Sequence, residues 1–436
     1  MRFIPRANAR PITYNLYMPR MPYLIFDKSS LESLNIDESV LLDTFYSCVI
    51  TPIFFVECLA DLEKKIKSNS TPEQLVGSLA DRTPEYESCV TLHHLDILRW
   101  ELIGKFSLLQ LKGGPFVAGA KSVQLGDQKG VIFQQTKEQE AMHRWTAREF
   151  VDAERLVAKW WRRTLTAIDF NAMVATLMAG IGPHWRKPKT LQDAREMTDI
   201  IIDHMDQEWL LGFGIDLFDV SDVKAQTVSG WVGNRRPPLR ECMPYFIFML
   251  SINIFFCLVL RTQLLRNVKP SHQIDLAYLY YLPFCSIFTS KDNFHAQIVP
   301  LFVTPEQSFI NGIDLKDDLK KLDEHYSALD ESEFKKGTTS FASHPPDDAA
   351  FLTTRLWDKH VPKWRDEPPP IKLSKELQDT LMGIMKKVPG SQQVAPHNIG
   401  SVSELGYVSM ESKIRLRKGK YRRFSEETER SIKDGE

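Results

Sequence analysis

Cysteine is scarce in this chain of 436 residues, and its thiols form no recognisable pattern. The six cysteines include no CxxC pair, and none lies near a histidine at the spacing of a zinc site. A disulfide framework and a zinc finger are therefore excluded as the basis of the fold, and a reducing compartment is expected. The N-terminus also lacks the apolar centre of about 7–15 residues that a signal peptide requires. Together these features predict a cytoplasmic location.

A charge excess is also missing, because 55 Lys and Arg face 56 Asp and Glu, which leaves a net charge of −1. Any nucleic-acid-binding surface must therefore be a local patch. Walker A, GxGxxG and G-x-S-x-G motifs are absent as well, which removes the signatures of three large enzyme classes. With 43% hydrophobic residues, 25 Phe, 12 Tyr and 9 Trp, the chain is typical of a folded globular protein.

Long hydrophobic runs are limited to one, residues 243–260, which carry no charge and contain Pro244, Ser251 and Asn253. Two interpretations remain open. A helix that is apolar all round is typical of a core helix, which here is expected to cover one face of a sheet. A single membrane anchor is the minority alternative.

Apolar runs that end in an acid predict buried strands of an α/β fold. Residues 22–27 form one such run, followed by a short helix for which Ser29 or Ser30 is the expected N-cap. A second helix is expected to begin near Pro52, since proline suits a first helical turn. Residues 285–290 and 297–304 are predicted to be further strands.

Four acids stand out by their positions. Asp27 and Asp292 follow predicted strands, Glu57 lies in an apolar helix, and Asp275 opens another helix. Each acid alone also suits a structural role, for example Asp275 as an N-cap or Asp292 as a turn residue. The carboxyl ends of parallel strands meet at one sheet edge, so we expect the four carboxylates to lie together. Mutual repulsion requires cations there, and oxygen ligands favour Mg²⁺ or Mn²⁺.

These motifs resemble the PIN domain, a small α/β nuclease fold. YLIFDKSSLESL resembles its opening strand, acid and hydroxyl turn; ITPIFFVECLADL resembles its helix with the second acid; and IDLAYLYYLPFCSIFTSKDNF resembles its closing signature. The match covers about 120 residues, roughly 22–70 and 240–305. Two departures are the long insertion between the second and third acids, and Lys28 where Thr or Ser is usual.

The resemblance implies a role for each matching residue. Asp27, Glu57, Asp275 and Asp292 would bind the metal and carry catalysis, while Ser29 and Ser290 are the matching hydroxyls and Asp61 assists. Apart from the resemblance, His295 lies three residues after Asp292, where contact with a scissile phosphate is a minority interpretation. PIN-like nucleases mostly cut RNA. Metal-dependent endonucleolytic cleavage of RNA is therefore the expected activity. A toxin or phage-defence role, with an inhibitory antitoxin partner, is a further hypothesis that no residue tests.

The insertion is expected to select the substrate. Residues 136–165 read as one long helix of strong helix formers, on which Arg148, Arg155, Lys159 and Arg162 share a face. They are the candidate phosphate contacts, although a solvated helix face is the competing interpretation. The basic run 413–423 is equally open between nucleic-acid contact and a solvated tail.

The predicted organisation is an N-terminal arm (1–21), a PIN-like core in two parts (22–74 and 240–310), a mainly helical insertion (75–239), and a polar, partly disordered C-terminal region with a basic tail (311–436). The alternative function is a catalytically inactive PIN-like scaffold that binds a protein or nucleic-acid partner. Lys28 favours this alternative, because its ammonium could occupy the place of a metal.

Overall fold

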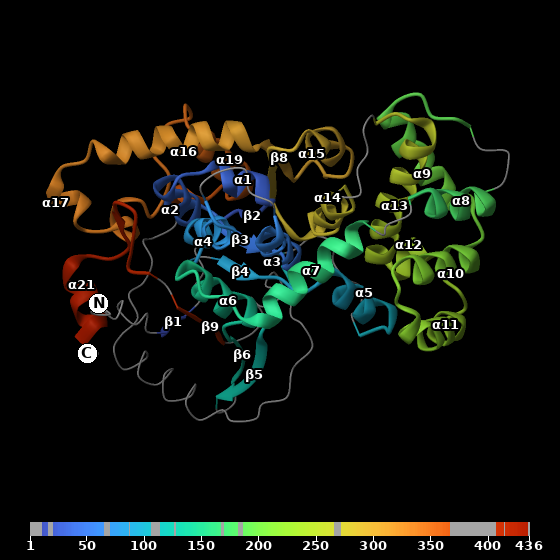
Figure 1. The fold of residues 1–436 in the computed structure, drawn as a ribbon, viewed down its shortest axis with the longest axis horizontal. Helices are drawn as coiled ribbons and strands as arrows, with labels where there is room; N and C mark the ends of the chain where they lie inside the picture. The colour runs from blue at the N-terminus through green and yellow to red at the C-terminus, as the bar shows by residue number, and fades with distance from the viewer. Residues whose placement is uncertain are drawn as a thin grey trace.

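A five-stranded parallel sheet forms the centre of the fold in the computed structural model (Figure 1). The structure describes residues 11–15, 21–64, 70–86, 88–105, 114–125, 128–166, 170–181, 186–265, 272–366, 407–413 and 415–434. In spatial order, the strands of the sheet are β4 (Ser88–Val90), β3 (Ser47–Ile50), β2 (Tyr23–Phe26), β7 (Ile287–Ser290) and β8 (Ser308–Asn311). All neighbouring pairs are parallel. The predicted α/β class with a parallel sheet flanked by helices is therefore confirmed.

Strand order places a topological switch between β2 and β7. Along the chain, β2 is followed by β3 and β4 on one side, whereas β7 is followed by β8 on the other. The chain therefore leaves the centre of the sheet in opposite directions from these two strands. In open α/β sheets a crevice forms at such a point, outside the carboxyl ends of the strands, and this crevice is where ligands bind.

Helices flank this sheet, and several of them start directly at the carboxyl ends of its strands. They are α1 (Lys28–Ser33), α2 (Ile36–Phe45), α3 (Pro52–Leu59), α4 (Pro72–Arg82), α14 (His272–Leu279), α15 (Asn293–Ile298), α16 (Gly312–Ser327) and α19 (Leu352–His360). Short 3-10 turns extend them at η1 (Ala60–Glu63), η3 (Leu282–Phe284), η4 (Val299–Leu301) and η5 (Trp364–Asp366).

A mainly helical region lies to the right of the sheet in Figure 1. Its helices and those that lead to it are α5 (His94–Leu102), α6 (Lys137–Thr146), α7 (Asp152–Thr166), α8 (Phe170–Ile181), α9 (Leu191–His204), α10 (Gln207–Leu217), η2 (Ser221–Val223), α11 (Lys224–Gly233), α12 (Leu239–Cys242) and α13 (Pro244–Thr262).

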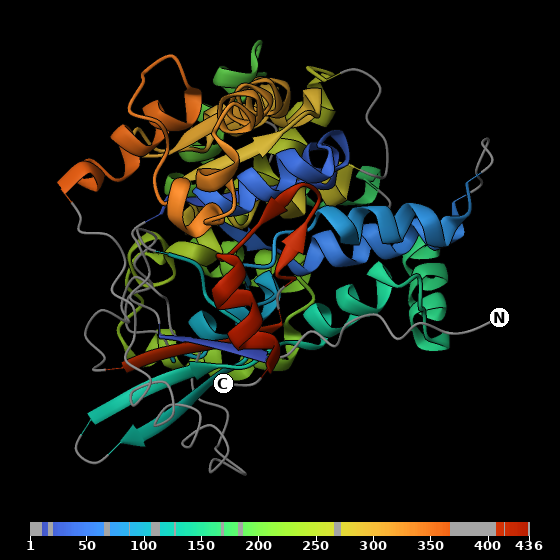
Figure 2. The same ribbon diagram turned by 90° about the vertical axis from the view of Figure 1, so that its left-hand side faces the viewer.

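A second, mixed sheet brings distant parts of the chain side by side (Figure 2). Its strands, in order, are β1 (Pro11–Asn15), β9 (Tyr407–Lys413), β6 (Gln128–Phe133) and β5 (Ala120–Leu125). The chain ends in a hairpin and a helix, β10 (Arg417–Lys418), β11 (Tyr421–Arg422) and α21 (Glu426–Asp434), which follow the short helices α17 (Glu331–Phe334) and α18 (Thr338–Phe341). The predicted N-terminal arm therefore includes a strand; its remaining residues up to position 20 lie outside the described part.

Helix α13 is the apolar run noted in the sequence, and it is the centre of the helical region. It is the one helix among the described residues that is long and apolar enough to cross a membrane, and 78% of that apolar window is buried in the protein. It packs against α5, α8, α9, α12 and α14 rather than across a face of the sheet, so that expectation is wrong. Asn253 is satisfied inside it, since its Nδ2 donates to the Met249 carbonyl and to the Tyr280 hydroxyl, both at 2.9 Å.

Three local expectations are corrected. The N-cap of α1 is Asp27, not Ser29 or Ser30, because the Asp27 side chain accepts from the Ser30 amide and the helix begins at Lys28. Residues 297–304 are not a strand. Helix α15, which Asp292 caps, continues to Ile298, and η4, with a proline in its first turn, follows it directly. The fifth strand is instead β8, whose sequence SFIN is too short to give a clear pattern.

Both predicted parts of the core extend further along the chain than their predicted last residues, 74 and 310. Strand β4 pairs with β3, so the first part of the sheet continues beyond residue 74 to Val90. The second part continues beyond residue 310, because Trp357 of α19 donates to the Phe45 carbonyl and the Tyr46 hydroxyl donates to Thr353. Residues 367–406, part of the region expected to be disordered, lie outside the described residues.

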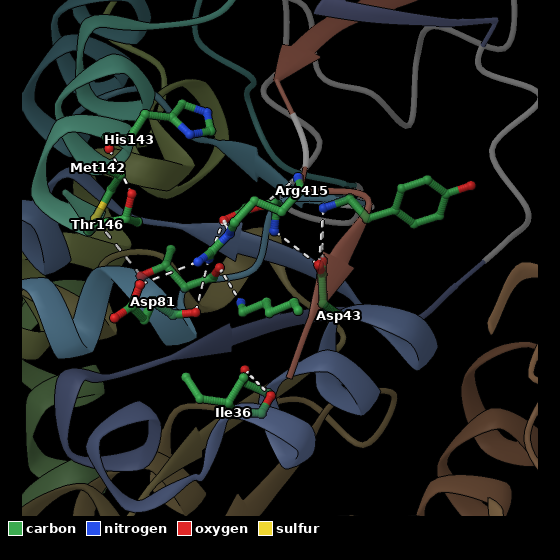
Figure 3. A network of polar contacts seen from close by, with 12 residues as sticks. Ile36, Asp43, Asp81, Met142, His143, Thr146 and Arg415 are labelled. Carbon is green, nitrogen blue, oxygen red and sulfur yellow. Dashed lines mark hydrogen bonds and ion pairs between the residues drawn. The ribbon is translucent and has the colours of Figure 1, made fainter. Parts of the chain in front are cut away.

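The basic run near the C-terminus is folded onto the core. Arg415 pairs with Asp81 (Figure 3) and with Glu85, and the buried Lys418 donates to the Thr83 carbonyl at 3.0 Å. Other basic residues reach two further acids, since Arg423 pairs with Asp43 and Lys420 pairs with Asp323. Local acids therefore neutralise much of the charge of the run, which is packed on the core rather than forming a solvated tail, while its contact with nucleic acid stays a prediction.

The Asp43–Arg423 pair gives a stability prediction. Asp43 is fully buried and Arg423 is 4% exposed. Replacing Arg423 with Ala leaves a buried carboxylate that keeps only the Glu85 and Tyr86 amides as donors. We expect a loss of about 3 kcal/mol in the free energy of unfolding, because removing one partner of a buried pair uncovers the desolvation cost of the other. Urea denaturation measures it.

Arg417→Ala is the matched control, since Arg417 is exposed on the same hairpin. Surface changes of this kind alter stability by less than about 0.5 kcal/mol. Equal midpoints for the two variants would show that the buried pair does not stabilise the fold.

Candidate functional site

The candidate site lies at the carboxyl ends of β2 and β7, at the topological switch. Asp27 directly follows β2 and is 3% exposed. Its Oδ1 accepts from the Ser30 amide at 2.9 Å, and its Oδ2 accepts from the Ser290 hydroxyl at 2.7 Å. The Ser29 hydroxyl lies 2.9 Å from Oδ1 and 2.8 Å from Oδ2, so its one hydrogen serves either oxygen. Two segments of chain that are far apart in sequence therefore meet at this carboxylate.

His295 of α15 completes this network and carries a positive charge. Its Nε2 lies 2.9 Å from the Asp275 carbonyl oxygen, which can only accept a hydrogen. Its Nδ1 lies 2.8 Å from Ser290 Oγ, whose single hydrogen is donated to Asp27. Both ring nitrogens must therefore donate, which makes the ring an imidazolium.

The pKa values agree with that protonation state. Burial alone would lower the pKa of His295, but the hydrogen bond and charge of Asp27, with Asp275, raise it to about 9. Burial alone would raise the pKa of Asp27, but His295, Ser290 and the Ser30 amide hold it below its usual range. The Asp27 carboxylate and the His295 ring, with Nδ1 3.4 Å from Oδ2, form a buried ion pair.

Glu57 and Asp275 carry much less compensation. Burial raises the pKa of Glu57 to about 8, and the charges of Asp27 and Asp275 raise it further. The charge of Lys28 and the Tyr278 hydroxyl, which donates to Glu57 Oε2 at 2.8 Å, act in the opposite direction. Burial also raises the pKa of Asp275 to about 7, with His295 opposing and the charges of Asp292 and Asp27 adding. In the described part of the chain, no side chain donates a hydrogen bond to the Asp275 carboxylate. Both acids therefore resist ionisation at neutral pH.

Asp292 is half-buried and caps α15, since its Oδ1 accepts from the Phe294 amide at 2.7 Å. Its own amide donates to Ser290 Oγ at 2.9 Å, which links it to the same network. The structure thus brings Asp27, Glu57, Asp275, Asp292, Ser29 and Ser290 into one neighbourhood. Among the described residues, however, no three Asp, Glu, His or Cys side chains are grouped tightly enough to form a ready metal cage.

Lys28 does not occupy the place of a metal at Asp27. Its ammonium pairs with Asp61 at 2.7 Å and with Glu32 at 3.3 Å. Burial opposes its charge, but the carboxylates of Asp61, Glu57 and Glu32 raise the pKa of Lys28 above its ordinary value. Asp61 therefore acts as a partner of Lys28 in this arrangement.

Two expectations for substrate contacts are corrected. The His295 side chain is fully buried and both ring nitrogens face protein atoms, so it cannot reach a scissile phosphate. The long helix expected over 136–165 is broken between α6 and α7, because Glu154 accepts from the Val151 amide and starts a new helix. Arg148 lies in the break with φ 62° and is not on the face expected for it.

Ion pairs occupy two of the four candidate phosphate contacts. Arg148 pairs with Asp81 at 2.7 Å, and Arg155 pairs with Glu73 at 2.9 Å. Lys159 is exposed on α7, while the side chain of Arg162 lies outside the described residues. Tyr278 is a site residue that the sequence reasoning missed, although it follows Asp275 by about one helical turn and therefore shares its face.

The protonation of His295 can be tested by NMR. We expect its ring protons to titrate with a midpoint near pH 9, because Asp27 stabilises the imidazolium. In Asp27→Asn the midpoint should fall below the ordinary value of about 6.5, since burial then dominates. The resonance is assigned by its loss in His295→Gln. A wild-type midpoint below pH 7 would contradict the ion pair.

The same shift predicts how stability depends on pH. A raised pKa in the folded state stabilises the fold fully below pH 6.5, and this contribution is lost as the pH rises through about 9. The difference in unfolding midpoint between wild type and His295→Gln should therefore shrink between pH 7 and 10.

Comparisons with protein-family models, with curated proteins and with solved structures each find no match to this chain. Its function must therefore be inferred from the geometry and charge of the site itself.

Proposed function

We propose that this chain is a divalent-metal-dependent nuclease with a PIN-like core that hydrolyses phosphodiester bonds in RNA. The observation that carries the proposal is the pair of poorly compensated carboxylates, Glu57 and Asp275, at the topological switch of a parallel sheet. Strongly perturbed acids in such a position are typical of functional sites. The order of the motifs along the chain supports the PIN-like interpretation. A strand followed by an acid comes first, a helix that carries an acid comes second, and an acid, a strand and a further acid come last.

The chemistry of the donor set suits a hard divalent cation, although no three of the described acids are grouped as a ready cage. Glu57, Asp275 and Asp292 offer carboxylate oxygens, which Mg²⁺ and Mn²⁺ prefer. Asp27 receives hydrogens from Ser29, Ser30 and Ser290 and pairs with the imidazolium of His295. A carboxylate has about four lone-pair positions, so these partners occupy Asp27, and the other three acids are left to bind a cation. The raised pKa values of Glu57 and Asp275 would fall when a cation supplies the missing charge.

The protein residues have distinct tasks in this proposal. Glu57, Asp275 and Asp292 would hold the cation, and Glu57 would also accept a proton from the attacking water. Ser290 and His295 fix the orientation of Asp27, while the Tyr278 hydroxyl fixes that of Glu57. The Lys28 ammonium pairs with Asp61, so Asp61 is not among the proposed ligands of the cation. A bound Mg²⁺ or Mn²⁺ would supply the positive charge that activates water and stabilises the leaving oxygen.

The Asp27–His295 ion pair favours a second candidate, a catalytically inactive PIN-like scaffold. The imidazolium already neutralises Asp27, and the described acids form no ready cage. In this case the fold binds a protein or nucleic-acid partner and cleaves nothing.

Cleavage of a 5′-labelled single-stranded RNA in Mn²⁺ separates the two candidates. We expect the wild type to cleave and EDTA to abolish cleavage. Glu57→Gln and Asp275→Asn should each lower kcat/KM by at least about 100-fold, because each removes an oxygen ligand and its charge. Asp317→Asn, an exposed acid on α16, is the matched control and should cleave like the wild type.

A thermal shift gives a second readout that does not depend on activity. Mn²⁺ should raise the Tm of the wild type and of Asp317→Asn, because a ligand that binds only the folded state stabilises it. The Glu57→Gln/Asp275→Asn double variant should show no shift. Metal-independent cleavage, or full activity of both single variants, would refute the proposed site; no cleavage and no thermal shift would favour the scaffold.

A further inference from the structure

The first turn of α16 lies beside the acid cluster. Strand β8 ends at Asn311, which pairs in register with Ser290, and α16 begins at the next residue, Gly312. The helix packs against α1, β7 and β8 (Figure 1). Its N-terminus therefore opens at the same sheet edge as Asp27 and Asp292. Helix N-termini attract anions, because their first amides lack partners within the helix and carry partial positive charge.

An unpaired buried hydroxyl faces this turn. Ser30 is 5% exposed, and its Oγ has no hydrogen-bond partner among the residues that the structure describes. A β-carbon at Gly312 would lie 2.8 Å from that oxygen, so Ser30 Oγ is directed at the first residue of α16. An unsatisfied buried hydroxyl costs roughly 1–3 kcal/mol, and an acceptor held at this turn would recover part of that cost. This oxygen is an observation independent of the helix itself.

Lys291 places the stem of its side chain against the same turn. Its side chain is exposed, and within the described residues its ammonium forms no ion pair. Its Cγ would lie 2.7 Å from a β-carbon at Gly312, and its amide donates to Ser29 Oγ at 3.1 Å. Only glycine permits this close approach of the lysine stem. The stem is flexible, so the ammonium can fold over an anion bound at the turn.

We propose that Gly312, Ser30 and Lys291 form a phosphate-binding subsite for the backbone of single-stranded nucleic acid. The inference rests on the proposed nuclease function for the identity of its ligand. A strand held there would pass directly beside the acid cluster, since Ser29 links the Lys291 amide to Asp27. The subsite would thus position a phosphate that neighbours the bond to be cleaved.

Two local features weaken the binding of an anion at this subsite. The Ile313 amide is already capped by Asn311 Oδ1 at 2.9 Å. Asp314, exposed in the first turn, repels an anion. Removing the charge of Asp314 should therefore strengthen binding, whereas removing that of Lys291 should weaken it.

Fluorescence anisotropy with a labelled single-stranded oligouridylate, in EDTA and at low salt, tests the subsite without cleavage. We expect Lys291→Gln to weaken binding about 3- to 10-fold and to reduce the salt slope by about 0.7, the value for one phosphate contact on a single strand. Ser30→Ala should weaken binding about 3-fold while its Tm stays equal or rises, because it deletes an unpaired hydroxyl. Asp314→Asn should bind about 2-fold more tightly.

Lys320→Gln is the control, since Lys320 is exposed on the same helix and pairs with Glu324. It should bind like the wild type. Unchanged binding in both Lys291→Gln and Ser30→Ala would overturn the subsite, even if the wild type cleaves RNA in Mn²⁺. Weakened binding in those variants together with a wild type that never cleaves would keep the subsite and reject the nuclease.

Discussion

The buried contact between Asp27, Ser290 and His295 is the interaction on which the site depends. Asp27 and Ser290 are 263 positions apart, and their hydrogen bond joins the first and second parts of the parallel sheet at its centre. Because a buried carboxylate is tolerated only with charge and hydrogen-bond partners, this contact both holds β2 next to β7 and fixes the chemistry at their ends. The same carboxylate also caps α1, so the start of that helix is set by the residue at the centre of the site.

Charge is then shared unequally among the remaining acids. Asp27 receives an imidazolium, and Asp61 receives the Lys28 ammonium. Glu57 receives the Tyr278 hydroxyl and the charge of Lys28, and Asp275 faces the charge of His295, but burial still raises the pKa of each into the neutral range. The site therefore contains two acids whose charge the fold compensates and two that burial holds against ionisation. In the proposed function, the second pair would bind the divalent cation.

The sequence predicted the parts of this arrangement that depend on local pattern. An apolar run ending in Asp27, a proline before the helix of Glu57, and a run ending at Ser290 each identified an element correctly, because burial and helix starts leave a signature within a few residues. The sequence could not show that His295 is buried, since its partners come from β2 and α14. Asp152 and Glu154 suit a first helical turn, but nothing in the sequence separated a new helix at α7 from the continuation of one long helix.

The two edges of the sheet differ in a way that stability alone does not explain. At the amino-terminal edge, before β3 and β4, Asp43 and Glu85 are paired with Arg423 and Arg415, which arrive from the far C-terminus. The chain can therefore bring cations over long distances to neutralise buried acids. At the carboxyl edge the cation that faces Asp275 is His295, which is already paired with Asp27, and Lys28 is turned toward Asp61. A fold optimised only for stability would compensate both edges, and the shortage of positive charge at one edge is what motivates the proposal that a cation and a polyanion bind there.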